Sequence, residues 1–379
     1  MQERMTEALP APDTVRDLWQ SLREAEAPLV VYGMGDGADK LTARLSQLNL
    51  SVADYFASDS FVRGQSFHGK PLRTFRQIKE TYSRPIILLG FATKQPDVMQ
   101  AIWNMAQSDT LFIPDLPVCG ETYFDAAFYA ANFERLYRVY HLLADDKSKR
   151  VFETAIAAKL YGRVPDLFAH TDTPENVTAP LHPHRYRTTV DAGAYNGDTV
   201  RTLLVQNPAI RRIHALEPDA GNFAKLRAYA QTVPHTEIVC HRAAAWDSVG
   251  SAPFGRAGNR GAALFGRTHA SRPDSVPLVT IDRLCAGERV DFIKYDVEGA
   301  EVRALQGSAQ TIAASRPELL LSLYHRSEDL FELPLLVAQL CPDYRLYLRR
   351  PPCLPLWELN LLAVPKEAHT NNESPMGIP

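Results

Sequence analysis

Four carboxylates and a histidine stand at the ends of apolar runs, where side chains could act on one small ligand. Asp191 ends the run TTVD and opens a glycine turn, VDAGAYNGDT. Glu217 ends the next run, 26 residues later. Asp296 ends a later run, Glu298 lies two residues beyond it, and His325 ends the run after that. Such residues at the ends of buried strands indicate ligand binding or acid–base chemistry.

The glycine turn and the acid that follows it predict an adenosine-binding crevice. Small residues let a ligand approach the backbone, and a carboxylate on the next strand can accept both hydroxyls of a ribose. Ala243 and Ala244 leave room for an adenine ring, whose edge Asp247 could hydrogen-bond. The predicted cofactor-binding residues are Asp191, Gly193, Ala194, Tyr195, Gly197, Asp198, Thr199, Glu217, Pro218, Ala244 and Asp296. A turn that only packs a strand on a helix is the alternative.

The glycine spacing distinguishes two nucleotide cofactors. A nicotinamide dinucleotide uses G-x-G-x-x-G, whereas this turn reads Gly193-x-x-x-Gly197 after an acid at the strand end. Asp191 and Asp198 near the helix start would repel a pyrophosphate but favour a cationic sulfonium and its amino group. The sequence therefore predicts S-adenosylmethionine as cofactor.

Asp296, Glu298 and His325 are the candidate catalytic residues for methyl transfer to a hydroxyl. In-line positioning of the reactants can lower the activation free energy by about 7 to 11 kcal/mol. A base that removes the hydroxyl proton raises the reaction rate by about 10²- to 10⁴-fold. Each residue has a structural alternative: Asp296 or His325 could cap a helix, Asp296 could contact the cofactor's amino group, and a structural role is favoured for Glu298. These three side chains could suit a divalent metal, but no fixed ligand spacing supports one, so no metal is predicted.

Residues 248–275 are rich in glycine and arginine and have little regular pattern. Guanidinium groups match phosphate and carboxylate oxygens, so Arg256, Arg260 and Arg267 are candidate binding residues for a phosphorylated or nucleotide-linked sugar. A solvated hairpin is the alternative, and it is the favoured interpretation of this stretch.

Two α/β units must position these residues. In residues 1–120, the apolar runs PLVVYG, SVADYFAS and RPIILLGFAT alternate with helical patterns, which predicts a doubly wound parallel sheet. Residues 121–184 are predicted to be a helical linker followed by a Pro-rich entry segment. Residues 185–366 form the second α/β domain, and residues 367–379 are predicted to be a disordered tail.

The second domain is expected to be a doubly wound sheet with an unusual end. Its apolar runs are TTVDAG, RIHALEP, EIVCHRAA, VPLVTID, DFIKYDV and ELLLSLY, with helical patterns between most of them. YRLYLRR and LWELNLLAVP then follow with no helix between them. These two runs are predicted to pair antiparallel at the sheet edge.

Length and composition limit the classes of protein. A chain of 379 residues exceeds the usual size of one core. The net charge of −3 without a basic block argues against nucleic acid, and no apolar run suits a signal peptide or a membrane span. The five cysteines make no C-x-x-C pair, so they are predicted to be reduced. A cytoplasmic enzyme with a small-molecule or sugar acceptor is expected, and homo-oligomerisation is left open.

The segment GMGDGA, residues 33–38, supports a rival interpretation. It fits G-x-G-x-x-A, and Asp54 follows Gly33 by 21 residues. An NAD(P)- or nucleotide-sugar-dependent oxidoreductase is the alternative function, although no Y-x-x-x-K pair follows. A scaffold role for this turn, or a role of the whole first domain in recruiting a partner, fits the sequence as well.

The segments VDAGAYNGDT, EPD, TIDRL and DFIKYDVEGAE, with the closing strands LYLRR to LNLLAVP, resemble the FkbM family of methyltransferases over residues 185–365. The resemblance implies a seven-stranded Rossmann-like sheet, S-adenosylmethionine as donor and an oxygen of a sugar, sugar nucleotide or secondary metabolite as acceptor. LLADDKSKRVFETAI is similar to segments of two-domain members that have an N-terminal Rossmann-like domain. Many members have a Glu in the strand after DVEGAE, where this chain has Ser322, so that Glu's role is not carried over.

Overall fold

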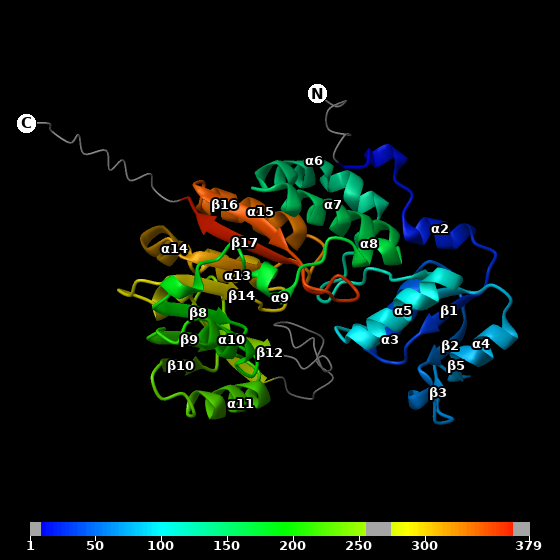
Figure 1. Cartoon of the computed structure of the whole chain (residues 1–379), viewed down its shortest axis with the longest axis horizontal. Helices are drawn as coiled ribbons and strands as arrows, with labels where there is room; N and C mark the ends of the chain where they lie inside the picture. The colour runs from blue at the N-terminus through cyan, green and yellow to red at the C-terminus, as the bar shows by residue number, and fades with distance from the viewer. Residues whose placement is uncertain (1–8, 255–273, 367–379) are drawn as a thin grey trace, which may run out of the picture.

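The computed structural model describes residues 9–254 and 274–366 of the chain as two lobes, each built on a parallel or largely parallel sheet (Figure 1). The candidate acceptor residues Arg256, Arg260 and Arg267 lie outside the described residues, as does the predicted tail, residues 367–379. Within the described ranges, no helix has the length and apolar character needed to span a bilayer.

The N-terminal lobe is a five-stranded parallel sheet in the order β5-β2-β1-β6-β7, as the sequence predicted. All four side chains of β1 are buried, which is typical of a parallel strand covered on both faces. Helices α2 and α3 pack on one face, and α4 and α5 pack on the other. The elements are η1 (Pro12–Thr14), α2 (Leu18–Glu24), β1 (Leu29–Tyr32), α3 (Asp36–Gln47), β2 (Val52–Ala57), η2 (Asp59–Phe61), β3 (Ser66–Phe67), β4 (Lys70–Pro71), β5 (Arg73–Thr74), α4 (Phe75–Thr81), β6 (Ile86–Leu89), α5 (Pro96–Ser108) and β7 (Thr110–Phe112).

Two long helices connect the lobes and share their hydrophobic core. One cluster of buried side chains extends from Val30 of the N-terminal sheet through Phe152 of α7 to Leu361 of the second sheet. The predicted linker is therefore a packed layer, and Figure 1 shows its two long helices at the top of the molecule beside α15 (Asp329–Leu340) and β16 (Tyr344–Arg349). Its elements are α6 (Ala126–Leu142), α7 (Asp146–Tyr161), α8 (Val164–Phe168), α9 (Pro174–Val177) and η3 (Pro183–Arg185).

The C-terminal lobe is a seven-stranded sheet in the order β10-β9-β8-β14-β15-β17-β16, which confirms the expected number of strands. Strand β17 runs antiparallel to both of its neighbours, so the predicted antiparallel pair closes the edge. The elements are β8 (Thr188–Ala192), α10 (Asp198–Gln206), β9 (Arg212–Leu216), α11 (Ala220–Ala230), β10 (Glu237–His241), β11 (Ala244–Ala245), β12 (Gly250–Phe254), β13 (Asp274–Val279), α12 (Ile281–Leu284), β14 (Phe292–Tyr295), α13 (Glu301–Gln306), α14 (Ala309–Ser315), β15 (Glu318–Ser322), α15 (Asp329–Leu340), β16 (Tyr344–Arg349) and β17 (Asn360–Pro365).

The run VPLVTID differs from the expectation, because β13 lies outside the main sheet. It pairs with β11 and β12 in a separate three-stranded sheet. Val276 and Leu278 are buried, whereas Ser275 and Pro277, which alternate with them, are exposed. Such alternation suits a sheet with one face in solvent, while the central strand β14 is buried at all four positions.

The glycine turn of the N-terminal lobe is filled by protein backbone. A Cβ on Gly37 would lie 2.6 Å from the Gly90 carbonyl oxygen, and one on Gly33 would lie 3.0 Å from it. Asp54, the acid of the proposed fingerprint, sits inside β2 and binds Arg73 at 2.7 Å and the Tyr82 hydroxyl at 3.0 Å. The alternative oxidoreductase function is therefore not supported, because the acid is paired within the sheet and the glycines serve close packing.

Candidate active site

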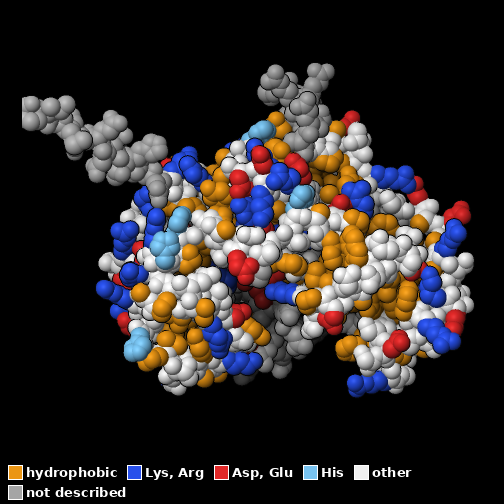
Figure 2. Space-filling view, viewed as in Figure 1, with side chains coloured by type: hydrophobic (Ala, Val, Ile, Leu, Met, Phe, Trp, Pro, Cys, Tyr) orange, Lys and Arg blue, Asp and Glu red, His pale blue; other side chains and the backbone are white. Residues whose placement is uncertain are grey.

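A cavity of about 720 Å³ lies between the two lobes, at the carboxyl ends of β8, β9, β14 and β15. The space-filling view shows the molecule hollowed between its lobes, with acidic and basic side chains at the hollow (Figure 2). Most of the wall comes from the C-terminal lobe, but Ala92, Lys94 and Val118 come from the N-terminal half. Such a volume is typical of a site for a small molecule.

The glycine turn after β8 forms part of the cavity wall. Gly193 has φ 86°, and a Cβ at this position would lie 1.9 Å from the carbonyl oxygen of Asp296. The backbone N–H groups of Gly193 and Ala194 both donate to the Leu216 carbonyl, at 3.0 and 2.9 Å. The turn thus brings the ends of β8, β9 and β14 together, and only glycine fits at its first position.

The structure brings most of the predicted cofactor residues to this cavity but places three of them behind its wall. Those at the cavity are Gly193, Tyr195, Asp198, Thr199, Glu217, Pro218, Ala244 and Asp296. Asp191 and Ala194 are fully buried beneath the turn, and Gly197 packs against Leu226 and Tyr229. Asp247 does not line the described part of the cavity. Its carboxylate forms an ion pair with Arg303 at 2.6 Å.

Glu217 is fixed at the end of β9 by two backbone groups. Its carboxylate accepts the N–H of Tyr195 and the N–H of Asp219, each at 2.8 Å. Burial raises the pKa of Glu217 to about 7, although these two hydrogen bonds oppose the shift. The side chain therefore holds the glycine turn in place and presents a carboxyl group to the cavity.

Lys294 is a cation at the centre of the site that the sequence analysis did not single out. Its Nζ donates to Asp191 Oδ1 at 3.3 Å and to the Gly193 carbonyl at 3.2 Å, and it lies 3.4 Å from Asp296 Oδ2. Burial opposes its charge, but Asp191 and Asp296 hold the pKa of Lys294 above its ordinary value. Burial raises the pKa of Asp191 to about 6 even though Lys294 opposes that change. A lysine within a fully buried strand is the sequence signal for this role.

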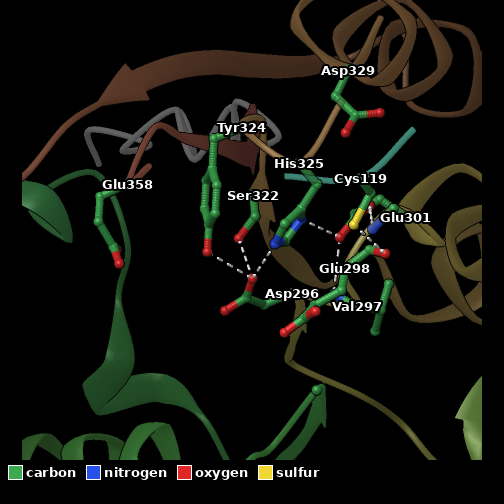
Figure 3. A network of polar contacts seen from close by, with 12 residues as sticks. Cys119, Asp296, Val297, Glu298, Glu301, Ser322, Tyr324, His325, Asp329 and Glu358 are labelled. Atoms are coloured by element: carbon green, nitrogen blue, oxygen red, sulfur yellow. Dashed lines mark hydrogen bonds and ion pairs between the residues drawn. The ribbon is translucent and has the colours of Figure 1, made fainter. Parts of the chain in front are cut away.

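Asp296 accepts several hydrogen bonds at the end of β14 (Figure 3). Its Oδ1 accepts the Ser322 hydroxyl at 2.9 Å and the Tyr324 hydroxyl at 3.2 Å, and lies 3.5 Å from His325 Nε2. Burial favours the neutral acid, but the charges of Lys294 and His325 outweigh it and lower the pKa of Asp296 to about 2. Asp296 is therefore ionised and is a weak proton acceptor at neutral pH.

His325 lies between two carboxylates, and Glu301 is the closer one (Figure 3). Glu301 Oε1 lies 2.8 Å from His325 Nδ1 and also accepts the Val297 N–H at 2.9 Å, while Oε2 accepts the Gly299 N–H at 2.9 Å. Burial opposes the imidazolium, but Glu301 and Asp296 raise the pKa of His325 to about 9. Glu301 is the last residue of the segment DVEGAE and the first residue of α13. The sequence did not indicate that its side chain is buried there.

Glu298 differs from Asp296 in its surroundings. The residue has φ 50°, an uncommon left-handed conformation for a side chain of this type. Its Oε2 is buried and has no hydrogen-bond partner among the described residues, and its carbonyl accepts the Cys119 thiol at 3.2 Å. Burial raises the pKa of Glu298 to about 7, with His325 opposing and Asp296 adding to the shift. A carboxyl group that titrates near neutral pH can exchange protons with a ligand.

One part of the cavity wall joins the two lobes. Thr93 and Leu354 exchange backbone hydrogen bonds of 2.7 and 3.0 Å. The neighbouring Lys94 forms an ion pair with Glu358, and both side chains line the cavity together with Trp357. No metal-binding group of three or more His, Cys, Asp or Glu side chains is found in residues 9–254 and 274–366.

The comparisons with known proteins concern this same region. Residues 191–350 match the family model described as Methyltransferase FkbM domain. The solved methyltransferase FkbM of Methylobacillus flagellatus KT has a TM-score of 0.66 at 20% identity, covering 94% of each chain. An rRNA methylase of Streptococcus thermophilus has a TM-score of 0.34 at 11% identity, covering 51% of this chain and 97% of its own. No curated protein matches the sequence. The first similarity establishes a shared fold across both lobes.

Proposed function

We propose that this chain, whose residues 191–350 match the Methyltransferase FkbM domain model, transfers a methyl group from S-adenosylmethionine to a hydroxyl oxygen. The observation that carries the proposal is the acidic cavity at the carboxyl ends of β8, β9 and β14. Six carboxylates line its described part, against three lysines and His325. This excess of negative charge favours a cationic sulfonium ligand over a pyrophosphate.

The residues around the glycine turn fit the donor nucleotide. Each oxygen of Glu217 already accepts one backbone N–H, yet a carboxylate oxygen can accept a second bond, so ribose hydroxyls fit there. Ala243, Ala244 and Ala245 line the cavity where a flat base needs room. When bound, S-adenosylmethionine supplies an electrophilic methyl group. The described residues themselves bind, orient and exchange protons.

Glu298 is the proposed proton acceptor for the hydroxyl. Glu298 lines the cavity, and its Oε2 has no hydrogen-bond partner among the described residues. Its pKa of about 7 is close to neutral pH, which suits a general base. Asp296, with a pKa of about 2, stays ionised and is suited to orient the ligands by electrostatic contacts and hydrogen bonds. The positive charge of His325 helps to keep Asp296 ionised. With S-adenosylmethionine bound as methyl donor, the Glu298 carboxylate would accept the proton that the hydroxyl loses on methylation.

The acceptor hydroxyl is proposed to belong to a sugar, a sugar nucleotide or a secondary metabolite. The cavity volume of about 720 Å³ is large enough to hold two small molecules side by side. To identify the acceptor, the protein and S-adenosylmethionine are incubated with extracts of such compounds. Mass spectrometry then detects the product, which is heavier than the acceptor by one CH₂ group.

Calorimetry with S-adenosylhomocysteine tests the donor assignment directly. Titration with NADH and NADPH on the same preparation provides the comparison. We expect saturable binding of S-adenosylhomocysteine and none of the nicotinamide nucleotides. Binding of a nicotinamide nucleotide alone would overturn the proposal.

A further inference from the structure

The wall shared by the two lobes has no assigned role in the donor site. Lys94, Trp357 and Glu358 line the cavity together with Tyr324, which follows β15. The donor region is instead bounded by the glycine turn, Glu217 and the alanines after β10. A ligand that receives a methyl group must contact cavity residues other than those of the donor region, and the wall shared by the lobes supplies such residues.

The shared wall is held firmly in place. The Thr93–Leu354 bridge fixes the loop that carries Lys94 next to the loop that carries Glu358. The Lys94–Glu358 ion pair then joins the two loops, with 54% and 23% of the two side chains exposed. In Figure 3, Glu358 lies on the same side of Asp296 as Tyr324, whose hydroxyl donates to Asp296. The wall therefore adjoins the carboxylate cluster at which the chemistry is proposed.

We propose that Lys94, Trp357 and Glu358 form the acceptor subsite, and that this subsite takes an uncharged ring bearing adjacent hydroxyls. The inference rests on the proposed function, because it names the acceptor class of that same site. It also gives the N-terminal lobe a role: the lobe supplies Lys94 and so takes part in choosing the acceptor.

The polar groups of the wall suit hydroxyls. An ammonium group donates and a carboxylate accepts, so the Lys94–Glu358 pair can bind two neighbouring hydroxyls without net charge. Trp357 offers an aromatic face, and its buried indole N–H has no acceptor among the described residues. A sugar ring has both hydroxyl edges and an apolar C–H face, which is the combination that these side chains complement.

The charge of the described lining favours an uncharged acceptor over a phosphorylated one. Six carboxylates face three lysines and His325 in the described lining, and Lys294 is already engaged with Asp191 and Asp296. A phosphate placed against the wall would meet Glu358 as well as Lys94, and the charges of these two side chains already offset each other. The expectation of a phosphorylated or nucleotide-linked sugar rests on Arg256, Arg260 and Arg267, which lie outside the described residues.

Saturation-transfer NMR tests the subsite with a defined probe. The protein is mixed with methyl α-D-glucopyranoside, with and without S-adenosylhomocysteine, and glucose 6-phosphate is the charged probe. We expect transfer to the ring protons of the neutral glycoside, and a loss of at least about fivefold in Lys94→Met and Trp357→Ala. Glucose 6-phosphate should give the weaker signal.

Matched variants separate this role from general effects on folding. Lys79→Met removes another ion pair of the same lobe, Lys79–Asp109, and Trp103→Ala removes another half-buried indole, packed on Phe168. Neither residue lines the cavity in its described part, so both variants should keep the wild-type signal. If Trp357→Ala does not fold, Lys94→Met and Glu358→Gln carry the test.

Each outcome decides the inference. No transfer to the glycoside, undiminished transfer in Lys94→Met, or a stronger signal from glucose 6-phosphate would overturn it. Calorimetry with S-adenosylhomocysteine on the same samples reports on the proposed function separately. A protein that binds the glycoside through Lys94 but not S-adenosylhomocysteine would keep the subsite and lose the methyltransferase assignment.

Discussion

Replacing Glu301 with glutamine removes the closer of the two carboxylates that surround His325. The substitution keeps the size of the side chain, and its amide can still contact the imidazole. Glu301 Oε1 lies 2.8 Å from Nδ1, whereas Asp296 Oδ1 lies 3.5 Å from Nε2. Because Glu301 is fully buried, its charge acts on His325 with little screening by water.

The size of the effect follows from the pKa of the imidazole. His325 has a pKa of about 9, against an ordinary value of 6.5, even though burial opposes the charged form. At about 1.4 kcal/mol per pH unit, the neighbouring groups favour protonation by about 3 kcal/mol net. An opposite charge within hydrogen-bond distance contributes about 1 to 3 pH units. We therefore expect the pKa of His325 to fall by at least about 1 pH unit in Glu301→Gln.

Histidine labelled with ¹³C at Cε1 allows this pKa to be measured by NMR titration. The chain has 11 histidines, and the resonance missing in His325→Gln identifies the residue of interest. Glu288→Gln is the matched control, because Glu288 lies 3.4 Å from His214 Nε2 and is not a partner of His325. Glu301→Asp should restore part of the shift. An unchanged pKa of His325 in Glu301→Gln would refute the reasoning.

Three further predictions follow from the same geometry. Glu298→Gln should slow methyl transfer by about 10²- to 10⁴-fold while changing S-adenosylhomocysteine affinity only a few-fold by calorimetry; full activity would exclude it as the base. Gly193→Ala should lower the melting temperature and abolish donor binding, since its Cβ would lie 1.9 Å from a carbonyl oxygen and positive φ adds about 1 to 3 kcal/mol. Gly250→Ala, with nothing within 4 Å, is its control and should melt as wild type does. The melting temperature should fall from pH 5 to pH 9, because the stabilisation from protonated His325 is present below 6.5 and lost as the pH rises towards about 9. Glu217 and Glu298, with pKa values of about 7 against 4.5, add to the loss between those values, and a higher melting temperature at pH 9 than at pH 6 would contradict this sign.

The sequence predicted the part of the site that depends on local pattern. Gly193 was recognisable because a glycine after an apolar run allows a tight turn, and the structure shows the close contact with Asp296 that requires it. Glu217, Asp296 and His325 were found because parallel strands present their carboxyl ends at one edge of a sheet. All of these residues line the cavity between the lobes.

The remaining features depend on contacts between distant segments. Lys294 and Asp191 are 103 residues apart, and nothing in either local pattern shows that the two charges meet. The same holds for Lys94 and Glu358, which come from different lobes. Asp191 was assigned to the ligand from its place at a strand end, but its side chain is turned into the protein, where Lys294 neutralises it. The spacing of residues in the sequence predicts where a strand ends. It does not predict which way a buried charged side chain points or which residue pairs with it.

The glycines of the N-terminal lobe give a last case in which one motif has two physical explanations. If Gly37 serves packing, its replacement should destabilise the protein with no ligand present, because the added Cβ would lie 2.6 Å from the Gly90 carbonyl oxygen. Overpacking of this kind costs about 1 to 3 kcal/mol, although alanine is otherwise the better helix former. Gly35→Ala, at the N-cap of α3 with open space around it, should cost about 1 kcal/mol or less. Thermal melts of both variants, with and without NADH, measure the difference. Equal melting temperatures for the two variants, or stabilisation by NADH, would contradict the packing explanation and support dinucleotide binding by this turn.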